Sequence, residues 1–112
     1  MNFKERPWGN YTVLHTEETC QVKKLALNPG MRISLQSHKF RAEHWFIVSG
    51  QGTAEIDGKE IEVGPGAAVD VPIGSKHRIS CGTSNPLVFI EVQTGSSFAE
   101  DDIVRYEDDF GR

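Results

Sequence analysis

The stretch from Gly30 to Gly50 reads G-MRISL-Q-S-H-KFRA-E-HWFIVS-G and decides the fold. It places Gln36, His38 and Glu43 close together between two glycine turns. Gln36 and His38 are two positions apart, a spacing that points both side chains to one face of a β-strand. Glu43 follows a short polar link and opens a strongly apolar run. The stretch therefore predicts two adjacent strands that carry three side chains able to ligate a metal.

A second stretch, residues 66–77, reads G-AAVDV-P-I-G-SK-H and adds His77 as a fourth candidate ligand. His77 follows a Pro-x-Gly turn at the head of another expected strand. Two imidazoles, a carboxylate and an amide oxygen form a mixed N/O set that suits zinc, manganese, iron, cobalt or nickel. The set contains no thiolate, which disfavours a closed structural zinc site. The alternative is that these side chains only line a lumen filled with water.

Short expected strands separated by Gly and Pro turns run through most of the chain. They cover residues 11–14, 21–27, 31–38, 43–48, 53–56, 59–63, 67–71, 77–81 and 87–93. This pattern, without helical periodicity, predicts an all-β barrel or sandwich built as one domain over residues 1–112. Residues 1–9 read as an irregular N-terminal arm. Residues 96–112 read as an acidic C-terminal tail, irregular or with a short helical turn that a capping box at residues 97–100 would open.

Composition and charge narrow the function classes. The chain has 112 residues, 38% hydrophobic and 25% charged, as in an ordinary globular domain with a modest core. The net charge of −4 argues against a nucleic-acid partner but permits an anionic substrate at a local basic cluster. No signal peptide or membrane-length apolar run is present, so we expect no membrane partner. Cys20 and Cys81 lie far apart and are expected to be reduced thiols, as in the cytoplasm.

The two stretches resemble the two sequence motifs of the cupin superfamily. The first has every spacing of Gly-x5-His-x-His-x4-Glu-x6-Gly, with Gln36 in place of the first histidine. The second has the spacing of Gly-x5-Pro-x-Gly-x2-His-x3-Asn, with Cys81 in place of the asparagine. The resemblance implies a single-domain cupin, a small jelly-roll-like β-barrel.

The chain is more closely similar to one branch of cupins, type II phosphomannose isomerase. This similarity rests on Arg6-Pro7-Trp8-Gly9, residues 34–38, Arg41, residues 43–45, 91–93 and 100–105. That domain is often the C-terminal part of a bifunctional mannose-1-phosphate guanylyltransferase. Here the resemblance covers nearly the whole chain and leaves no room for a guanylyltransferase domain. It implies one divalent metal, zinc first, held by Gln36, His38, Glu43 and His77.

The resemblance implies interconversion of mannose 6-phosphate and fructose 6-phosphate through an enediol, with the metal as Lewis acid. Glu91 is the first candidate for the proton carrier, because a carboxylate in an apolar strand must be paired or face the lumen. Burial would raise its pKa. The alternative is a structural ion pair with Arg32 or Arg105. Arg105 is the second catalytic candidate, folded over the barrel mouth, or else it pairs with Asp101 or Asp102.

Three basic residues near the ligand strands are assigned to the sugar phosphate, namely Arg41, Lys39 and Arg32. Arg41 has the planar fork that suits bidentate phosphate binding. Of the remaining histidines, His44 should lie opposite Glu43 as a packed or interface residue, and His15 should lie at the surface.

Two other functions stay open. The chain could be a noncatalytic sugar or sugar-nucleotide binding module that works beside a separate guanylyltransferase. It could also be another metal-dependent cupin enzyme such as an iron oxygenase, although Gln36 makes that assignment less natural. The strand over residues 43–48 is apolar on both faces, which favours burial on each side and a homodimer.

Overall fold

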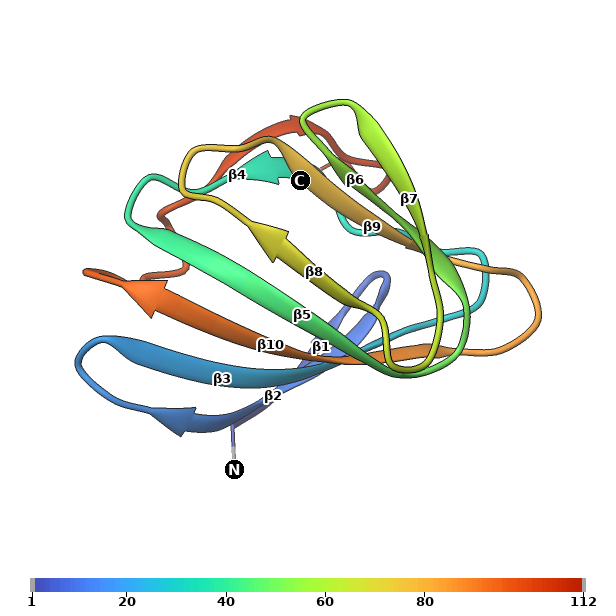
Figure 1. Cartoon of the computed structure of the whole chain (residues 1–112), viewed down its shortest axis with the longest axis horizontal. Coiled ribbons are helices and arrows are strands. Elements are labelled where there is room, and N and C mark those ends of the chain that lie inside the picture. Colours follow the sequence, from blue (N-terminus) through green and yellow to red (C-terminus); the bar gives the residue numbers. More distant parts are fainter. Residues whose placement is uncertain (1, 112) are drawn as a thin grey trace.

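The computed structural model describes residues 2–111, which form two antiparallel sheets around one core (Figure 1). The strands are β1 (Asn2–Arg6), β2 (Gly9–Thr16), β3 (Cys20–Leu27), β4 (Leu35–Ser37), β5 (Arg41–Ser49), β6 (Gly52–Ile56), β7 (Lys59–Val63), β8 (Ala68–Val71), β9 (His77–Cys81), β10 (Leu87–Gly95) and β11 (Val104–Glu107). One sheet has the order β1-β2-β3-β10-β5-β8 and the other β11-β4-β9-β6-β7. The expected all-β, single-domain architecture is confirmed. Residues 2–111 contain no helix of the length and hydropathy needed to span a membrane.

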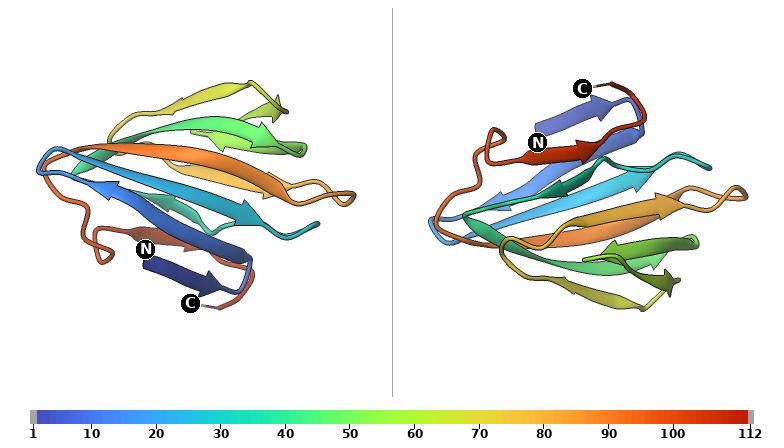
Figure 2. Two further views of the ribbon diagram at one scale, coloured as in Figure 1. Left: turned by 90° about the horizontal axis from the view of Figure 1, so that it is seen from below. Right: turned by 90° about the horizontal axis from the view of Figure 1, so that it is seen from above.

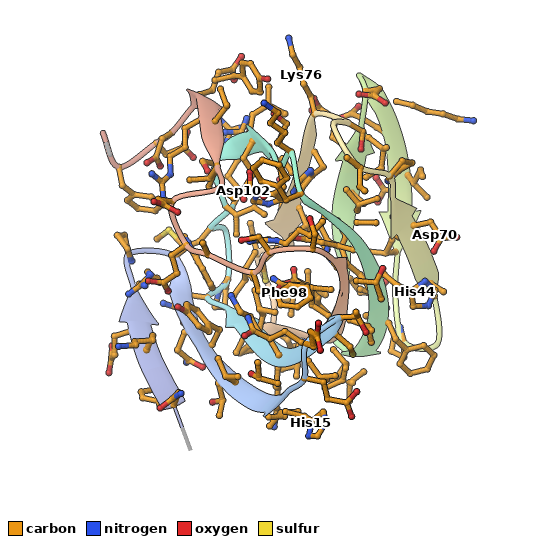
Figure 3. All side chains as sticks on the ribbon, turned by 90° about the vertical axis from the view of Figure 1, so that its left-hand side faces the viewer. His15, His44, Asp70, Lys76, Phe98 and Asp102 are labelled. Carbon is orange, nitrogen blue, oxygen red and sulfur yellow. The ribbon has the colours of Figure 1, made fainter. Side chains whose placement is uncertain are left out.

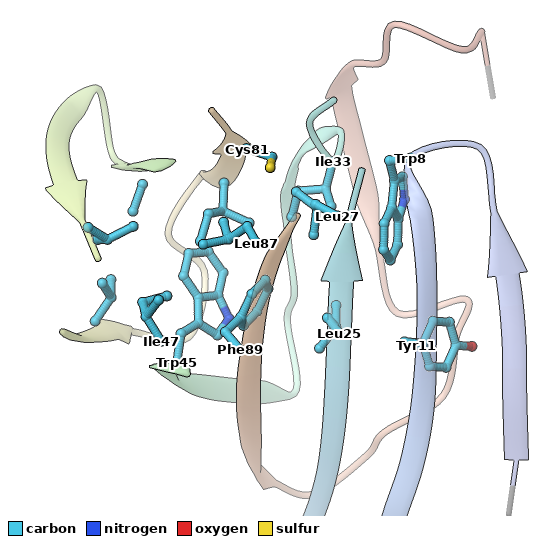
Figure 4. Close-up of a cluster of buried hydrophobic side chains, with 14 of the residues drawn as sticks. Trp8, Tyr11, Leu25, Leu27, Ile33, Trp45, Ile47, Cys81, Leu87 and Phe89 are labelled. Carbon is cyan, nitrogen blue, oxygen red and sulfur yellow. The ribbon is translucent and has the colours of Figure 1, made fainter. Parts of the chain in front are cut away.

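The core lies between the inner faces of the two sheets (Figure 4). Along β5 the side chains alternate, with Trp45 and Ile47 fully buried and Phe46 and Val48 exposed on the outer face. Trp45 packs against Phe89 of β10 with ring centroids 5.6 Å apart. Burying each such side chain contributes about 1.5–3 kcal/mol. Trp45 also meets the His77 ring of the other sheet, with ring centroids 5.8 Å apart.

The N-terminal segment differs from the expected irregular arm. Residues 2–6 form β1, which pairs with β2 so that Arg6 lies opposite Gly9. Pro7 and Gly9 therefore mark a tight β-hairpin, and an irregular arm over residues 1–9 is wrong for the described residues from Asn2 onward. The hairpin carries Trp8 into the core, where only 6% of its surface is exposed.

The C-terminal segment also differs, because the expected helical turn is wrong. Residues 97–103 make an extended connection with one turn, in which the Asp102 N–H donates to the Ala99 carbonyl, and β11 then pairs with β4. The Asp102 carboxylate accepts the backbone N–H groups of Lys39 and Phe40 at 2.9 and 2.9 Å, which fixes the segment to the β4–β5 turn. Glu100 of the connection lies 3.4 Å from Arg6 of β1, and Figure 2 shows the red C-terminal strand on the same side of the molecule as the blue N-terminal strands.

The strand expected over residues 31–38 is shorter in the structure. Only Leu35–Ser37 forms β4, and Arg32 makes an isolated bridge to Ser80. The simple alternation fails because Ile33 and Ser34 are both buried. In a regular strand with one buried face, neighbouring side chains point to opposite faces, so only one of the two would be buried. The break turns His38 into the interior next to the start of β5.

Candidate metal centre

Three of the four expected ligands converge at one buried point. His38 follows β4, Glu43 lies on β5 and His77 begins β9, and one ligand atom from each lies within 4.8 Å of the others. His38 Nε2 is 3.3 Å from Glu43 Oε2, and His77 Nε2 is 3.8 Å from Glu43 Oε1. The two imidazole rings are tilted against each other with centroids 4.9 Å apart. The two sheets therefore supply one constellation of two imidazoles and a carboxylate.

Backbone carbonyls orient both imidazoles. His38 Nδ1 lies 2.7 Å from the Asp102 carbonyl oxygen, and His77 Nδ1 lies 3.1 Å from that of Ser75. A carbonyl only accepts, so each Nδ1 carries the proton and each Nε2 presents a lone pair toward Glu43. Burial lowers the pKa of His38 to about 4 and also lowers the pKa of His77. Both rings are therefore neutral at physiological pH.

This arrangement fits a divalent cation. Two neutral imidazole lone pairs face a carboxylate. Arg41 donates to His38 Nε2 and to Glu43 Oε2, and the Trp45 indole N–H donates to Glu43 Oε1, so the remaining acceptor is His77 Nε2. Within residues 2–111, the His77 Nε2 atom is buried without any hydrogen-bond partner. An unsatisfied buried polar atom of this kind costs about 1–3 kcal/mol. A cation between the three side chains would satisfy every acceptor, and the absence of thiolate is consistent with a borderline metal such as zinc.

Gln36, the fourth expected ligand, lies beside this cluster. It pairs with His77 across β4 and β9. Its Nε2 donates to Ser34 Oγ at 2.9 Å and to the Ser34 carbonyl at 3.3 Å. These bonds use the amide nitrogen, and Gln36 lines the adjoining cavity. The amide oxygen is thus the atom of Gln36 that is chemically suited to a metal.

The Arg41 guanidinium is buried against the same cluster. It contacts Glu43 Oε2 through Nε and His38 Nε2 through Nη2, each at 3.3 Å. Its Nη1 donates to the Ala99 carbonyl at 3.3 Å. Sequence reasoning placed Arg41 near the ligand strands, and the structure brings its charge to the cluster itself.

Glu91 is a buried carboxylate that faces the same interior. Gln93 Nε2 donates to its Oε2 at 2.7 Å, and the Trp45 indole N–H is shared between Glu91 Oε1 at 3.1 Å and Glu43 Oε1 at 3.0 Å. Burial, together with the nearby Glu43 carboxylate, raises the pKa of Glu91 to about 7. Within residues 2–111 Glu91 makes no ion pair with Arg32 or Arg105, and its carboxylate oxygens accept hydrogen bonds from Trp45 and Gln93 instead.

A cavity of about 430 Å³ opens from this cluster between the two sheets and the N-terminal hairpin. Arg105 of β11 lines it. The sequence did not single out several other residues that line it, because they are distant along the chain. The lining comprises Glu5, Arg6, Pro7, Trp8, Tyr11, Lys23, Leu25, Ile33, Gln36, Arg41, Glu43, Glu91, Glu100, Ile103 and Arg105.

Two of the expected substrate-binding residues lie outside this cavity. Arg32 makes a two-bond ion pair with Asp109, at 2.7 and 2.8 Å, on the exposed surface. Lys39 is exposed, and its ammonium lies over the Phe40 ring at 5.5 Å. Both residues are close to the ligand strands in sequence, but their side chains point away from the barrel interior, and sequence distance does not reveal this direction. Within residues 2–111, neither Lys39 nor Arg32 lines this cavity.

The two other histidines lie at the surface. His15 is exposed beside Glu17, as expected. His44 is half-exposed and pairs with Asp70 at 2.6 Å, as Figure 3 shows at the side of the molecule. In the isolated chain His44 is therefore a surface ion-pair residue rather than a packed one.

Comparison with known proteins agrees with this geometry. Residues 2–108 match the family described as mannose-6-phosphate isomerase C-terminal. The chain belongs to this family. It is 45% identical over 109 residues to the xanthan biosynthesis protein XanB of Xanthomonas campestris, and 44% over 107 residues to the alginate biosynthesis protein AlgA of Pseudomonas aeruginosa. Each alignment covers 96% of this chain but only 23% and 22% of those proteins, so the chain spans less than a quarter of their length.

Solved structures show the same fold at low sequence identity. The Cnp3 cupin domain of Schizosaccharomyces pombe superimposes with a TM-score of 0.78 at 12% identity, over 85% of this chain and 69% of that one. KdgF from Halomonas sp. gives 0.78 at 16% identity, over 91% and 92%. The expected cupin fold is confirmed, and so is the resemblance to the phosphomannose isomerase branch.

Proposed function

We propose that this domain is a metal-dependent isomerase that interconverts mannose 6-phosphate and fructose 6-phosphate. The observation that carries the proposal is the pairing of two unlike buried groups on one cavity. The first is the cation-seeking cluster of His38, Glu43 and His77. The second is the Glu91 carboxylate, whose pKa lies near neutrality. The membership of the isomerase family supports the same reaction and substrate.

His38, Glu43 and His77, with Gln36 beside them, would hold one divalent cation, zinc first. When bound, the cation supplies Lewis-acid stabilisation for negative charge on a sugar oxygen. Asp102 and Ser75 hold the two imidazoles with Nε2 toward that position. Arg41 lies against His38 and Glu43, and its positive charge would attract an anionic substrate to the cluster.

Glu91 would carry the proton in the isomerisation. As a carboxylate it would take the proton from C2 of the open-chain aldose, and as the acid it would return that proton to C1. A base with a pKa near the working pH is the most effective for such a transfer. The Trp45 indole N–H and the Gln93 amide fix the orientation of its two oxygens. Arg105, at the cavity wall on β11, would close over the sugar.

A coupled assay for fructose 6-phosphate tests the proposal. We expect turnover of mannose 6-phosphate that is lost in chelator and restored by zinc or another divalent ion. Glu91→Gln should lower kcat by about 100-fold or more, in the range of a missing general base, while metal content stays unchanged. Glu62→Gln, on the exposed strand β7, serves as the matched control. Protein that is fully loaded with metal yet shows no turnover would contradict an isomerase.

A noncatalytic binding module is the second candidate, and one observation favours it. The chain spans less than a quarter of relatives whose remaining length could supply other activities. Tight binding of a sugar phosphate without turnover would identify such a module. Oxygen uptake with iron and small diols would identify the third candidate, an oxygenase.

We place the protein in the cytoplasm, where the free thiols Cys20 and Cys81 would persist.

A further inference from the structure

The basic residues that line the cavity differ in what they contact. Arg41 is bound to the metal cluster, and Arg6 donates to Tyr11 Oη at 3.2 Å and lies 3.4 Å from a Glu100 oxygen. Lys23 has no such partner. Within residues 2–111 its ammonium makes no ion pair, and it lies over the Tyr11 ring, 4.4 Å from Nζ to the centroid. Lys23 therefore presents to the cavity a positive charge that no carboxylate of residues 2–111 contacts at ion-pair distance.

The burial of Lys23 makes this charge costly. Desolvation lowers the pKa of Lys23 and Arg41 acts in the same direction, while the carboxylates of Glu91, Glu43 and Glu100 oppose the shift without touching the ammonium. Its neighbour Lys24 lies on the opposite face of β3 and is exposed, which is the usual place for a strand lysine. A charge taken out of water needs a partner, and a lysine without one inside a cavity points to an anion that arrives from outside.

The register of the sheet places Lys23 at a useful distance from the metal cluster. Lys23 of β3 is the direct cross-strand partner of Glu91 on β10, and Glu91 is the partner of Trp45 on β5. Neighbouring strands lie about 4.8 Å apart, so the Lys23 backbone is about 10 Å across the sheet from β5, the strand that carries Glu43. The sheet therefore sets Lys23 two strands away from the strand of the candidate ligand Glu43. Lys23, Glu91 and the cluster thus form a row along one face.

We propose that Lys23 binds the phosphate group of the sugar phosphate, with Arg105 contributing from the facing sheet. Arg105 lines the same cavity and lies opposite Gln36 across β11 and β4. This inference deepens the proposed isomerase and rests on it for the identity of the sugar. It replaces Lys39 and Arg32, which lie outside the cavity, with a residue inside it. The chemical requirement is a phosphoryl dianion on the β3 side of the cavity.

Binding of inorganic phosphate to the metal-loaded protein tests the proposal directly. We expect saturable NMR shifts at amides of β3 and β11 in the wild type and in Lys24→Met, and an affinity about 10- to 100-fold weaker in Lys23→Met. Any phosphate that contacts the metal is common to all three proteins and does not affect the comparison. Lys23→Gln, which keeps a donor without the charge, gives the same comparison should the methionine variant unfold. Unchanged affinity in both Lys23 variants, or no phosphate binding to the wild type, would overturn the proposal.

Turnover separates this inference from the proposed function. With mannose 6-phosphate, Lys23→Met should raise KM about 10-fold or more while kcat changes little, since the phosphate lies away from the reacting carbons. A wild type that binds phosphate through Lys23 but shows no turnover would contradict the isomerase and leave the anion site standing. An active wild type whose KM is unchanged in Lys23→Met would contradict the phosphate site at Lys23 and leave the isomerase standing.

Discussion

His38 and Asp102 are 64 positions apart in the chain, and His38 Nδ1 lies 2.7 Å from the Asp102 carbonyl oxygen. The Asp102 side chain fixes that carbonyl, because its two oxygens accept the backbone N–H groups of Lys39 and Phe40. The C-terminal segment, on which Asp102 is labelled in Figure 3, therefore sets the tautomer of the candidate metal ligand His38. Partners of this kind commonly raise metal affinity by orienting the ring.

Substitution of Asp102 should weaken metal binding although Asp102 is not a ligand. We expect Asp102→Ala to lower zinc affinity about 10- to 100-fold, the range for lost ligand-orienting contacts. The exposed neighbour Asp101 provides the control, and Asp101→Ala should bind zinc as the wild type does. Calorimetric titration of chelator-treated protein measures both. Equal affinity in the two variants would show that the Asp102 carboxylate is not needed to orient His38.

Gln36 and His77 should contribute unequally to the metal site. His77→Ala removes a buried imidazole whose Nε2 has no other partner in the described chain, and we expect metal binding to be abolished. Gln36→Ala removes a neutral amide oxygen, a weaker donor, and should lower affinity by a smaller factor. Metal analysis after dialysis against a fixed free-zinc concentration measures the difference. A larger loss for Gln36→Ala than for His77→Ala would reverse this order.

Without metal, the fold should lose stability as the pH falls through the histidine range. Burial holds the pKa of His38 at about 4, below its ordinary value of 6.5, and lowers that of His77 in the same direction. Between about pH 4 and pH 6.5 the unfolded chain therefore binds more protons at His38 than the folded chain does. Stability contributed by neutral His38 is complete above about 6.5 and is lost as the pH drops toward 4. Urea unfolding in chelator at several pH values should show a shallower decline for His38→Asn. A decline identical to the wild type would contradict the buried, neutral imidazole.

Gly9 should tolerate no side chain. Its φ is 152°, and a Cβ atom there would overlap the Ala26 carbonyl oxygen on β3. Gly9→Ala should destabilise the domain by about 3 kcal/mol or more, because backbone must move to admit the methyl group. Gly58→Ala, at a hairpin glycine with open space around it, should cost about 1 kcal/mol from backbone strain alone. Denaturant unfolding of both variants gives the comparison, and equal costs would place β2 and β3 further apart than described.

We propose that the domain forms a homodimer through the outer face of the six-stranded sheet. Phe46 and Val48 are 46% and 48% exposed there, while the opposite face of β5 is buried. The double variant Phe46→Ser and Val48→Ser should be monomeric in analytical ultracentrifugation if the wild type is dimeric. The exposed Ile73, substituted by serine, controls for the loss of surface apolar area elsewhere. A monomeric wild type at high concentration would dismiss the dimer.

Much of the site could be predicted from the sequence because short-range geometry determines it. The spacing from Gln36 to Glu43 and the turn before His77 bring these residues together through neighbouring strands. Strand parity alone did not suffice, since the regular alternation expected over residues 31–38 breaks at Ile33 and Ser34. The break depends on packing between sheets, which has no local signal.

The rest of the site could not be predicted because its partners are remote in the chain. Lys23 reaches the cavity through pairing of β3 with β10, and Asp102 reaches His38 through the C-terminal segment. Until the sheet order is known, nothing distinguishes Lys23 or Asp102 from the other polar residues of the chain. The N-terminal hairpin was missed for a related reason, since Pro7 and Gly9 signal a turn without revealing that both flanking segments are strands.

Anomalous diffraction from a crystal of protein purified without chelator tests the central claim most directly. The account predicts one strong peak for a divalent ion between the two sheets, ligated by His38 Nε2, His77 Nε2 and the Glu43 carboxylate, with Gln36 in contact. A map with no peak at this position, or with an ion bound elsewhere on the chain, would contradict it.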